Sequence, residues 1–244
     1  MTRGRPDGSG LRPLGLAAGL AALLLAAVTA VPAGADDRAV ATADPSAGDH
    51  AEAARGVRFS LGLLAGTTQF DAGLADYQWN TRPRMAWGGQ AMAGAGRFAA
   101  GLRLWTTRTT QAIGDLGDAP GVRATSIELV GEGRLAQRWG TELLATAGAG
   151  RLHLGYHPDQ VAIQPPGPVG AIVVALAPVD AWIAGGGLAV RRALLPGWSV
   201  ALGVEHRSFA IDTAHRVGNA IVLTRESFGD WSARFELARH LRRR

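Results

Sequence analysis

The chain has 244 residues, a formal net charge of +5 and no cysteine, so no disulfide bond can stabilise it. The sequence contains no lysine, and part of its positive charge lies in the "ARHLRRR" tail. No basic patch interleaved with aromatic residues is present, which argues against nucleic-acid binding, and no phosphate-binding loop, GxSxG motif or cysteine-based zinc site occurs.

The first segment of the chain has the three parts of a secretory signal peptide. These parts are the basic residues Arg3, Arg5 and Arg12, the apolar run 14–31, and the small residues Ala33, Gly34 and Ala35. An uncleaved membrane anchor is the alternative, because the run is long enough to span a bilayer. The cleavage site and the polar residues after it favour removal of residues 1–35, which leaves a flexible periplasmic leader over 36–56.

From residue 57 onward the sequence alternates with a period of two, which predicts β-strands. No apolar stripe of helical period follows the signal peptide, so the domain is predicted to be all-β. Glycine, with 34 residues, is frequent inside the predicted strands, although it weakens a strand in a soluble sheet. The eight predicted strands cover residues 57–66, 84–93, 97–107, 123–135, 139–154, 177–191, 198–210 and 228–241.

Short and long connections alternate between these strands. The short ones are residues 94–96, 136–138 and 192–197, and the long ones are 67–83, 108–122, 155–176 and 211–227. Outer-membrane barrels are up-and-down barrels with short periplasmic turns and longer extracellular loops. The alternation therefore predicts an antiparallel up-and-down transmembrane β-barrel over residues 57–241, with both termini in the periplasm and a basic tail over 242–244.

Each predicted strand has one apolar face and one face of charged and small residues. A soluble lipocalin-like barrel would turn the apolar face inward, whereas a membrane barrel turns it toward lipid. Small residues on the polar face favour the membrane barrel, because a narrow lumen must leave room for long charged side chains. Strand 177–191 stays ambiguous, since Asp180 and Trp182 share a face. The aromatic residues assigned to the membrane interfaces are Phe98, Trp139, Trp198 and Trp231.

The polar face predicts a lumen filled with ion pairs, since eight strands leave an interior just wide enough for side chains. A polar path for a solute is the alternative. The residues assigned to this charge network are Arg58, Arg84, Arg97, Arg103, Glu128, Glu132, Arg134, Glu142, Glu205, Arg207, Asp230, Arg234 and Glu236.

In pattern, residues 57–241 resemble the small eight-stranded outer-membrane barrels of Gram-negative bacteria, the OmpA/OmpX/OmpW-like group. The resemblance implies a monomer that is inserted by the barrel-assembly machinery and contacts outer-membrane lipid and lipopolysaccharide. We expect no cofactor and no metal. Such proteins usually end in an aromatic residue that the assembly machinery reads. This chain ends in "FELARHLRRR", so Phe235 or Leu241 would have to serve instead.

The stretch "VEHRSFA" offers one specific chemistry. His206 and Ser208 are two residues apart and share a face, which resembles the His-x-Ser pair of the PagL-type lipid A deacylases. The resemblance implies that Ser208 attacks an acyl ester, that His206 is the base, and that Glu226 orients His206. Phe209 stands where that family usually has asparagine, and the spacing to Glu226 is longer than the family's.

A metal site is a further hypothesis for "HLGYHPD", where His153, His157 and Asp159 share a face. The simpler interpretation is the polar rim at which a strand becomes a loop, and we predict no metal there.

The sequence thus predicts an outer-membrane β-barrel with a structural, surface-interaction or limited small-solute permeation role, an OmpW-like route being the first form of transport to consider. A lipid A esterase of the PagL type and a soluble periplasmic lipocalin-like carrier are the alternatives.

Overall fold

The computed structural model describes residues 57–113, 119–163, 170–217 and 220–241. The predicted signal peptide, leader and basic tail lie outside these residues. Within them, no helix is long and apolar enough to cross a membrane. The elements are β1 (Arg58–Phe70), the 3-10 helix η1 (Ala72–Tyr77), β2 (Arg84–Ala95), β3 (Phe98–Thr110), β4 (Gly121–Arg138), β5 (Thr141–His157), β6 (Gln160–Ile163), β7 (Ile172–Ala175), β8 (Val179–Leu195), β9 (Trp198–Val217) and β10 (Ala220–Leu241).

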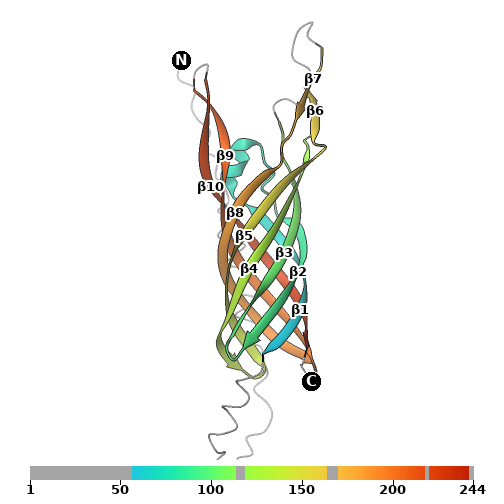
Figure 1. Ribbon diagram of the computed structural model, residues 1–244, viewed down its shortest axis with the longest axis vertical. Coiled ribbons are helices and arrows are strands. Elements are labelled where there is room, and N and C mark those ends of the chain that lie inside the picture. The colour runs from blue at the N-terminus through green and yellow to red at the C-terminus, as the bar shows by residue number, and fades with distance from the viewer. Residues whose placement is uncertain (1–56, 114–118, 164–169, 218–219, 242–244) are drawn as a thin grey trace, which may run out of the picture. The chain divides into compact units, whose positions relative to one another are not determined.

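Eight of the strands form a closed antiparallel barrel in the order β1-β10-β9-β8-β5-β4-β3-β2 (Figure 1). Strand β1 closes the ring because it pairs with β2 on one side and with β10 on the other, with Phe59 opposite Leu241. Closure leaves no sheet edge unpaired, which a strand structure needs in lipid. The predicted eight-stranded up-and-down barrel is confirmed.

The three short connections are two-residue turns at one end of the barrel, here called the short-turn end. They are residues 96–97, 139–140 and 196–197, and each contains a glycine with positive φ, at 62°, 74° and 79°. Trp139 also has a positive φ, of 49°, so it lies in its turn and does not begin the next strand. Turns with positive φ match the twist of the flanking strands and keep a hairpin tight.

The opposite end, here called the long-loop end, holds more regular structure than predicted. The connection 67–83 contains η1, and the connection 155–176 contains the small β6–β7 hairpin. Residues 211–227 are mostly strand, since β9 and β10 stay paired up to Val217 opposite Ala220. Both hairpins rise above the rim of the barrel (Figure 1).

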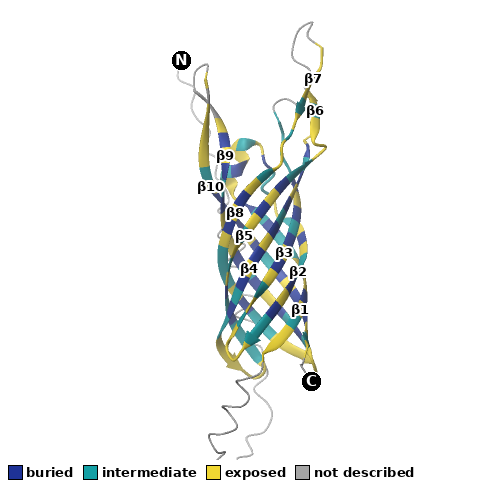
Figure 2. Cartoon of the chain, viewed as in Figure 1, coloured by how far each residue is buried: buried dark blue, intermediate teal, exposed yellow. Residues whose placement is uncertain are grey.

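The two faces of the barrel wall differ as a membrane requires. Buried and exposed residues alternate along the strands (Figure 2). Charged residues such as Arg207 and Asp230 are buried, whereas large apolar residues point outward. The predicted membrane-barrel arrangement is therefore confirmed, and the alternative of a lipocalin-like barrel with an apolar face turned inward is wrong. The exposed apolar residues include Leu61, Leu63, Trp87, Leu102, Ile127, Leu129, Leu188, Leu202 and Phe235.

The structure also resolves the ambiguous strand. In β8, Ala181 and Ile183 are buried, whereas Asp180 and Trp182 are exposed. Asp180 lies near the start of β8 at the long-loop end, so its outward position keeps its charge at the rim.

Exposed aromatic residues gather at two levels on the outside of the barrel. Phe98 and Trp139 are exposed at the short-turn end, where the half-buried Trp198 also lies. Trp87 and Trp182 are each the fourth residue of a strand that starts at the long-loop end. Trp231 belongs to this second level, because it pairs with Gln69 next to the end of β1. Two aromatic girdles on either side of an apolar band are typical of a transmembrane barrel.

Candidate functional site

The interior of the barrel has two layers, and the layer nearer the short turns is charged. At its upper edge Arg207 contacts Glu128 at 2.9 Å and Asp230 at 2.9 Å. Ser126 donates to Glu128 at 2.5 Å, and Ser232 donates to Asp230 at 3.2 Å. These groups are buried, so each charge is compensated by an opposite charge and a hydroxyl, as buried charges require.

A second cluster centres on Glu205. Its carboxylate pairs with Arg103 at 2.8 Å and with Arg234, and it accepts a hydrogen bond from Thr146 at 2.8 Å. Gln90 then joins this cluster to the next one, because it accepts from Arg103 at 3.2 Å and donates to Glu236 at 2.7 Å.

The third cluster lies toward the short turns. Arg191 pairs with Glu132 at 2.7 Å and with Glu236 at 3.7 Å. Arg134 pairs with Glu142 at 2.9 Å and is less buried than the pairs above it. The ion pairs therefore continue from the middle of the barrel almost to the short-turn end.

Most residues predicted for the charge network meet inside the barrel, but three do not. Arg97 lies in a turn, since β3 begins only at Phe98, and its side chain is exposed. Arg58 is the first residue of β1 and is exposed as well. Arg84 is half-buried, and its Nε has no hydrogen-bond partner in the described structure. In each case the alternation places the residue on the inner face, but the strand starts at or after that residue, so the residue lies at an end of the barrel and outside the charge network.

The charge network assigned from the sequence leaves out Arg191, Gln90 and Thr146, which the structure adds to it. Arg191 is in β8, whose facing the sequence left ambiguous, and the pairing of β8 with β5 and β9 decides it. Neutral polar partners such as Thr146 carry no charge signal. The alternation places Thr146 on the same inner face as Glu142, but a neutral hydroxyl does not identify it as a partner of an ion pair.

The second layer, toward the long loops, is apolar. Phe70 packs edge-on against Trp79 and Phe209, with ring centroids 6.0 and 6.2 Å apart. Leu74, from η1, is fully buried, so the first long connection is folded into the lumen. The sequence had predicted a polar lumen along its whole length. The structure shows that the part of the lumen near the long loops is apolar instead. Other members of this apolar plug are Val122, Ala124, Leu152, Leu154, Ala181, Ile183, Ile211 and Phe228.

Hydrogen bonds fix the folded-in connection to the wall. Asn80 N donates to Thr110 O at 2.9 Å, and Ala112 N donates to Gln78 O at 2.9 Å. The Thr109 hydroxyl donates to Asn80 O at 2.6 Å. Backbone groups of the connection are thus paired with the end of β3, which anchors the connection to the barrel wall.

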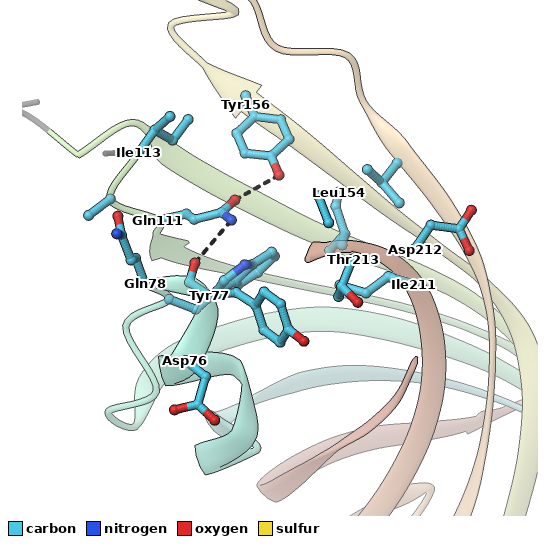
Figure 3. A pocket seen from close by; sticks show the side chains of 14 residues that line it. Asp76, Tyr77, Gln78, Gln111, Ile113, Leu154, Tyr156, Ile211, Asp212 and Thr213 are labelled. Carbon is cyan, nitrogen blue, oxygen red and sulfur yellow. Dashed lines mark hydrogen bonds between the residues drawn. The ribbon is translucent and has the colours of Figure 1, made fainter. Parts of the chain in front are cut away.

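Above the plug lies a cavity of about 520 Å³ (Figure 3). Gln111 bridges it, since Tyr156 donates to Gln111 Oε1 at 2.8 Å and Gln111 Nε2 donates to the Tyr77 carbonyl at 3.3 Å. Apolar side chains form much of the remaining wall together with Gln78 and Thr213. The charged lining residues, Asp76 and Asp212, point their carboxylates away from Gln111 (Figure 3). The lining residues are Asp76, Tyr77, Gln78, Trp79, Gln111, Ala112, Ile113, Leu154, Tyr156, Val179, Ile211, Asp212, Thr213 and Ala214.

The Tyr77 hydroxyl extends from this cavity to the β9–β10 hairpin. It donates a 2.6 Å hydrogen bond to Glu226. This bond to a carboxylate raises the pKa of the Tyr77 phenol above its ordinary value. The Tyr77 hydroxyl is the donor in this bond and links η1 to β10.

The structure does not bring the three predicted esterase residues together. His206 and Ser208 point outward from β9, and the His206 ring lies 4.8 Å from the Trp231 ring. Glu226 lies opposite Ile211 in the β9–β10 register, and its carboxylate accepts from Tyr77 at the mouth of the barrel. The wall separates Glu226 from His206, because the two side chains leave it on opposite faces.

The predicted alternative metal ligands are also dispersed. His153 pairs with Asp180 at 2.9 Å on the exposed outer face. Among the described residues, no group of three His, Cys, Asp or Glu side chains could hold a metal ion.

No protein-family model matches the sequence, and no curated protein matches it significantly. Solved structures with a similar fold include Neisserial surface protein A, at 9% identity over 74% of this chain and 96% of that chain, with a TM-score of 0.46. AlkL in lipid bilayers is 12% identical over 86% of this chain and 98% of its own, with a TM-score of 0.42. OprG from Pseudomonas aeruginosa is 10% identical over 77% and 97%, with a TM-score of 0.42.

The chain is an eight-stranded transmembrane β-barrel. Its own closed ring, apolar exterior and buried charge network define this class.

Proposed function

We propose that this protein is an outer-membrane barrel that is closed to ions and presents its mouth cavity at the cell surface, where the cavity binds a small neutral amphipathic molecule. The export signal predicted in residues 1–35 and the apolar outer face support the location. The long-loop end is then extracellular and the short turns are periplasmic, which is the usual arrangement of such barrels.

The observation that carries the proposal is the filled lumen beneath the cavity. Every strand of the barrel contributes a polar side chain to the charged layer, from Thr68 in β1, which contacts Ser232, to Asp230 in β10. The apolar plug covers that layer. An ion entering the lumen would have to break buried ion pairs and cross an apolar segment, and both steps are unfavourable.

The cavity has the composition of a site for a neutral ligand. Its volume of about 520 Å³ lies within the range of small-molecule sites, roughly 300–1,000 Å³. Trp79, Leu154 and Ile211 offer an apolar surface, and Gln111 and Tyr156 offer polar groups. We infer that the ligand has an aromatic or aliphatic body and one or two hydrogen-bonding groups.

The proposal of an outer-membrane barrel also includes how the chain is inserted and how many copies form the barrel. We propose that the barrel-assembly machinery reads the last strand through Phe235 or Leu241, which both point outward from β10. The closed ring satisfies the strand edges within one chain, which supports a monomer.

Conductance in planar bilayers tests the closed lumen. The wild-type barrel should show no large steady current, because the charged layer fills the lumen. A variant in which a glycine linker replaces Ala72–Tyr77 removes part of the plug but leaves the charged layer, so it should also remain closed. A large steady wild-type current would contradict the proposal, and a current only in the variant would show that the plug closes the lumen.

Ligand binding at the cavity can be followed on Trp79. Protein labelled with 15N-tryptophan in nanodiscs should show a shift of the Trp79 indole signal with 2-naphthol, and a much smaller shift with the anion naphthalene-2-sulfonate. Val179→Trp fills the cavity from β8 and should abolish the response. Val190→Trp, on the outer face of the same strand, is the matched control and should preserve it. Equal responses in both variants would place binding elsewhere.

A further inference from the structure

An arginine pair lies on the outer face of the barrel, close to the long-loop end. Arg108 of β3 and Arg123 of β4 are directly opposite each other in the antiparallel register, and both side chains are exposed. Thr106 and Thr125 form the next pair toward the short-turn end, with their hydroxyl oxygens 3.0 Å apart. The next pair on this face, Leu104 and Ile127, belongs to the exposed apolar band.

Like charges directly opposite each other in a sheet repel and destabilise the pairing. No described carboxylate compensates Arg108 or Arg123. On the neighbouring strands Asp180 is engaged by His153 at 2.9 Å, and Gly155, opposite Arg123, has no side chain.

A third arginine lies on the same outer face, two residue pairs nearer the short turns, at the edge of the apolar band. Arg151 of β5 lies opposite Ile127, and its guanidinium is 4.8 Å from the centre of the Trp182 ring. Stacking on an aromatic ring leaves the edge of a guanidinium available to an anion. Arg108, Arg123 and Arg151, here called the arginine cluster, therefore place positive charge on one outer face, from the upper edge of the apolar band toward the long loops.

We propose that the arginine cluster binds the phosphate of a membrane lipid whose acyl chains lie on the apolar band around Leu104, Ile127 and Trp182. A guanidinium group binds phosphate oxygens with two parallel hydrogen bonds. A phosphate between Arg108 and Arg123 is attracted to both side chains and offsets their mutual repulsion. Because the inference rests on the proposed position of the long-loop end at the cell surface, the lipid it commits to is the phosphorylated lipid A of lipopolysaccharide.

The short-turn end carries arginines of a different kind. The Arg239 guanidinium lies 5.4 Å from the centre of the Trp198 ring, and the Arg138 guanidinium lies 3.8 Å from that of Trp139. Arg239 lies opposite Trp198 and Leu61, so no arginine faces it across the sheet. Arg239→Gln is therefore a matched control, since it removes one exposed arginine without touching the cluster.

The experiment compares thermal unfolding of the purified full-length barrel in a neutral detergent with and without diphosphorylated lipid A. Lipid A should raise the unfolding temperature of the wild type and of Arg239→Gln. In detergent alone Arg123→Gln should unfold at the same or a higher temperature than the wild type, because the repulsion is gone. With lipid A, Arg123→Gln should unfold at a lower temperature than the wild type. This reversal of sign is not expected of a residue with only a structural role.

Binding should be measured in parallel by native mass spectrometry of protein–lipid complexes. Each of Arg108→Gln and Arg123→Gln should weaken lipid A binding about tenfold, the effect of one lost charge-assisted contact. Arg123→Lys should retain part of the affinity, since it keeps the charge but not the fork.

Several results would overturn the proposal. Equal stabilisation by dephosphorylated lipid A would show that the acyl chains alone bind, and equal stabilisation by inorganic phosphate would show that the site takes free phosphate and no lipid. An equal loss of lipid A binding in Arg239→Gln would show that binding depends on the net charge of the barrel and not on the position of the arginine. Because micelles supply lipid to both ends of the barrel, the outcome does not depend on orientation in the cell, on the closed lumen or on the mouth cavity.

Discussion

Two adjacent residues of β9 show how sharply the environment changes across the wall. Leu202 points outward and is 43% exposed, whereas Gly203 is buried. A Cβ on Gly203 would lie 3.2 Å from Ala189 Cβ and 3.4 Å from Arg234 Nε. One position therefore meets lipid and the next meets the charged layer, because side chains alternate along a strand.

This difference predicts two distinct failures. Leu202→Arg places a charge in hydrocarbon and should reduce stability in bilayers by roughly 2–4 kcal/mol near the midplane. Gly203→Arg should prevent correct packing for steric reasons, whereas Gly203→Ser should fold after a small shift of Arg234. Folding into lipid vesicles, followed by heat-modified electrophoretic mobility and urea titration, measures both effects. Normal assembly of Leu202→Arg would contradict the lipid-facing assignment.

Glycines inside the strands allow neighbouring strands to approach closely on the inner surface. A Cβ on Gly101 of β3 would lie 1.9 Å from the carbonyl oxygen of Ala91 in β2. A Cβ on Gly150 of β5 would meet the carbonyl oxygen of Ile127 in β4 at the same distance. Backbone cannot move aside as a flexible side chain does, so these positions exclude every other residue. The glycine density that looks unfavourable for a soluble strand is required by the coiled wall of a narrow barrel.

A pair of alanine substitutions tests this requirement at the level of the strand. Gly101→Ala should lower the free energy of unfolding by more than about 3 kcal/mol, beyond ordinary overpacking, or prevent assembly. Gly131→Ala in β4 should be tolerated, because the nearest atom to its Cβ is the Ala147 oxygen at 3.9 Å. Urea titration of both variants in lipid vesicles gives the comparison. Similar losses in both would mean that loss of glycine itself is responsible and the close approach is not.

The whole barrel has two unlike ends. Both described ends of the chain lie at the short-turn end, since Phe59 in β1 pairs with Leu241 in β10. The long-loop end carries η1, the β6–β7 hairpin and the upper part of the β9–β10 hairpin. This asymmetry fixes the direction in which a surface cavity would face, once the orientation in the membrane is known.

Proteolysis of intact cells tests that orientation. A broad-specificity protease added outside should cut within the connection between β5 and β8, residues 158–178, because this connection lies at the long-loop end. The barrel itself should survive as a protected fragment, since its backbone hydrogen bonds lie within lipid. Cleavage seen only after the periplasm is opened would show that the barrel has the opposite orientation.

Local patterning in the sequence determined the strands, their faces and the alternation of turns. Alternation with a period of two is a property of each strand alone, so Leu202 and Arg207 could be placed on opposite faces before any pairing was known. The tight turns followed from glycine, and the choice between lipid and core followed from charge on one face. These features need no knowledge of which strand neighbours which.

Only the tertiary structure decided what meets inside the barrel. Register brings Glu205 to Arg103 across a separation of 102 residues, and it gives Arg191 a role that an ambiguous strand had hidden. It also folds η1 into the lumen, which makes the upper interior apolar, and it separates Glu226 from His206 by the barrel wall. A strand pattern states the face of a residue but not its height or its partner. Height and partner are set by strand order and stagger, which exist only once the ring is closed.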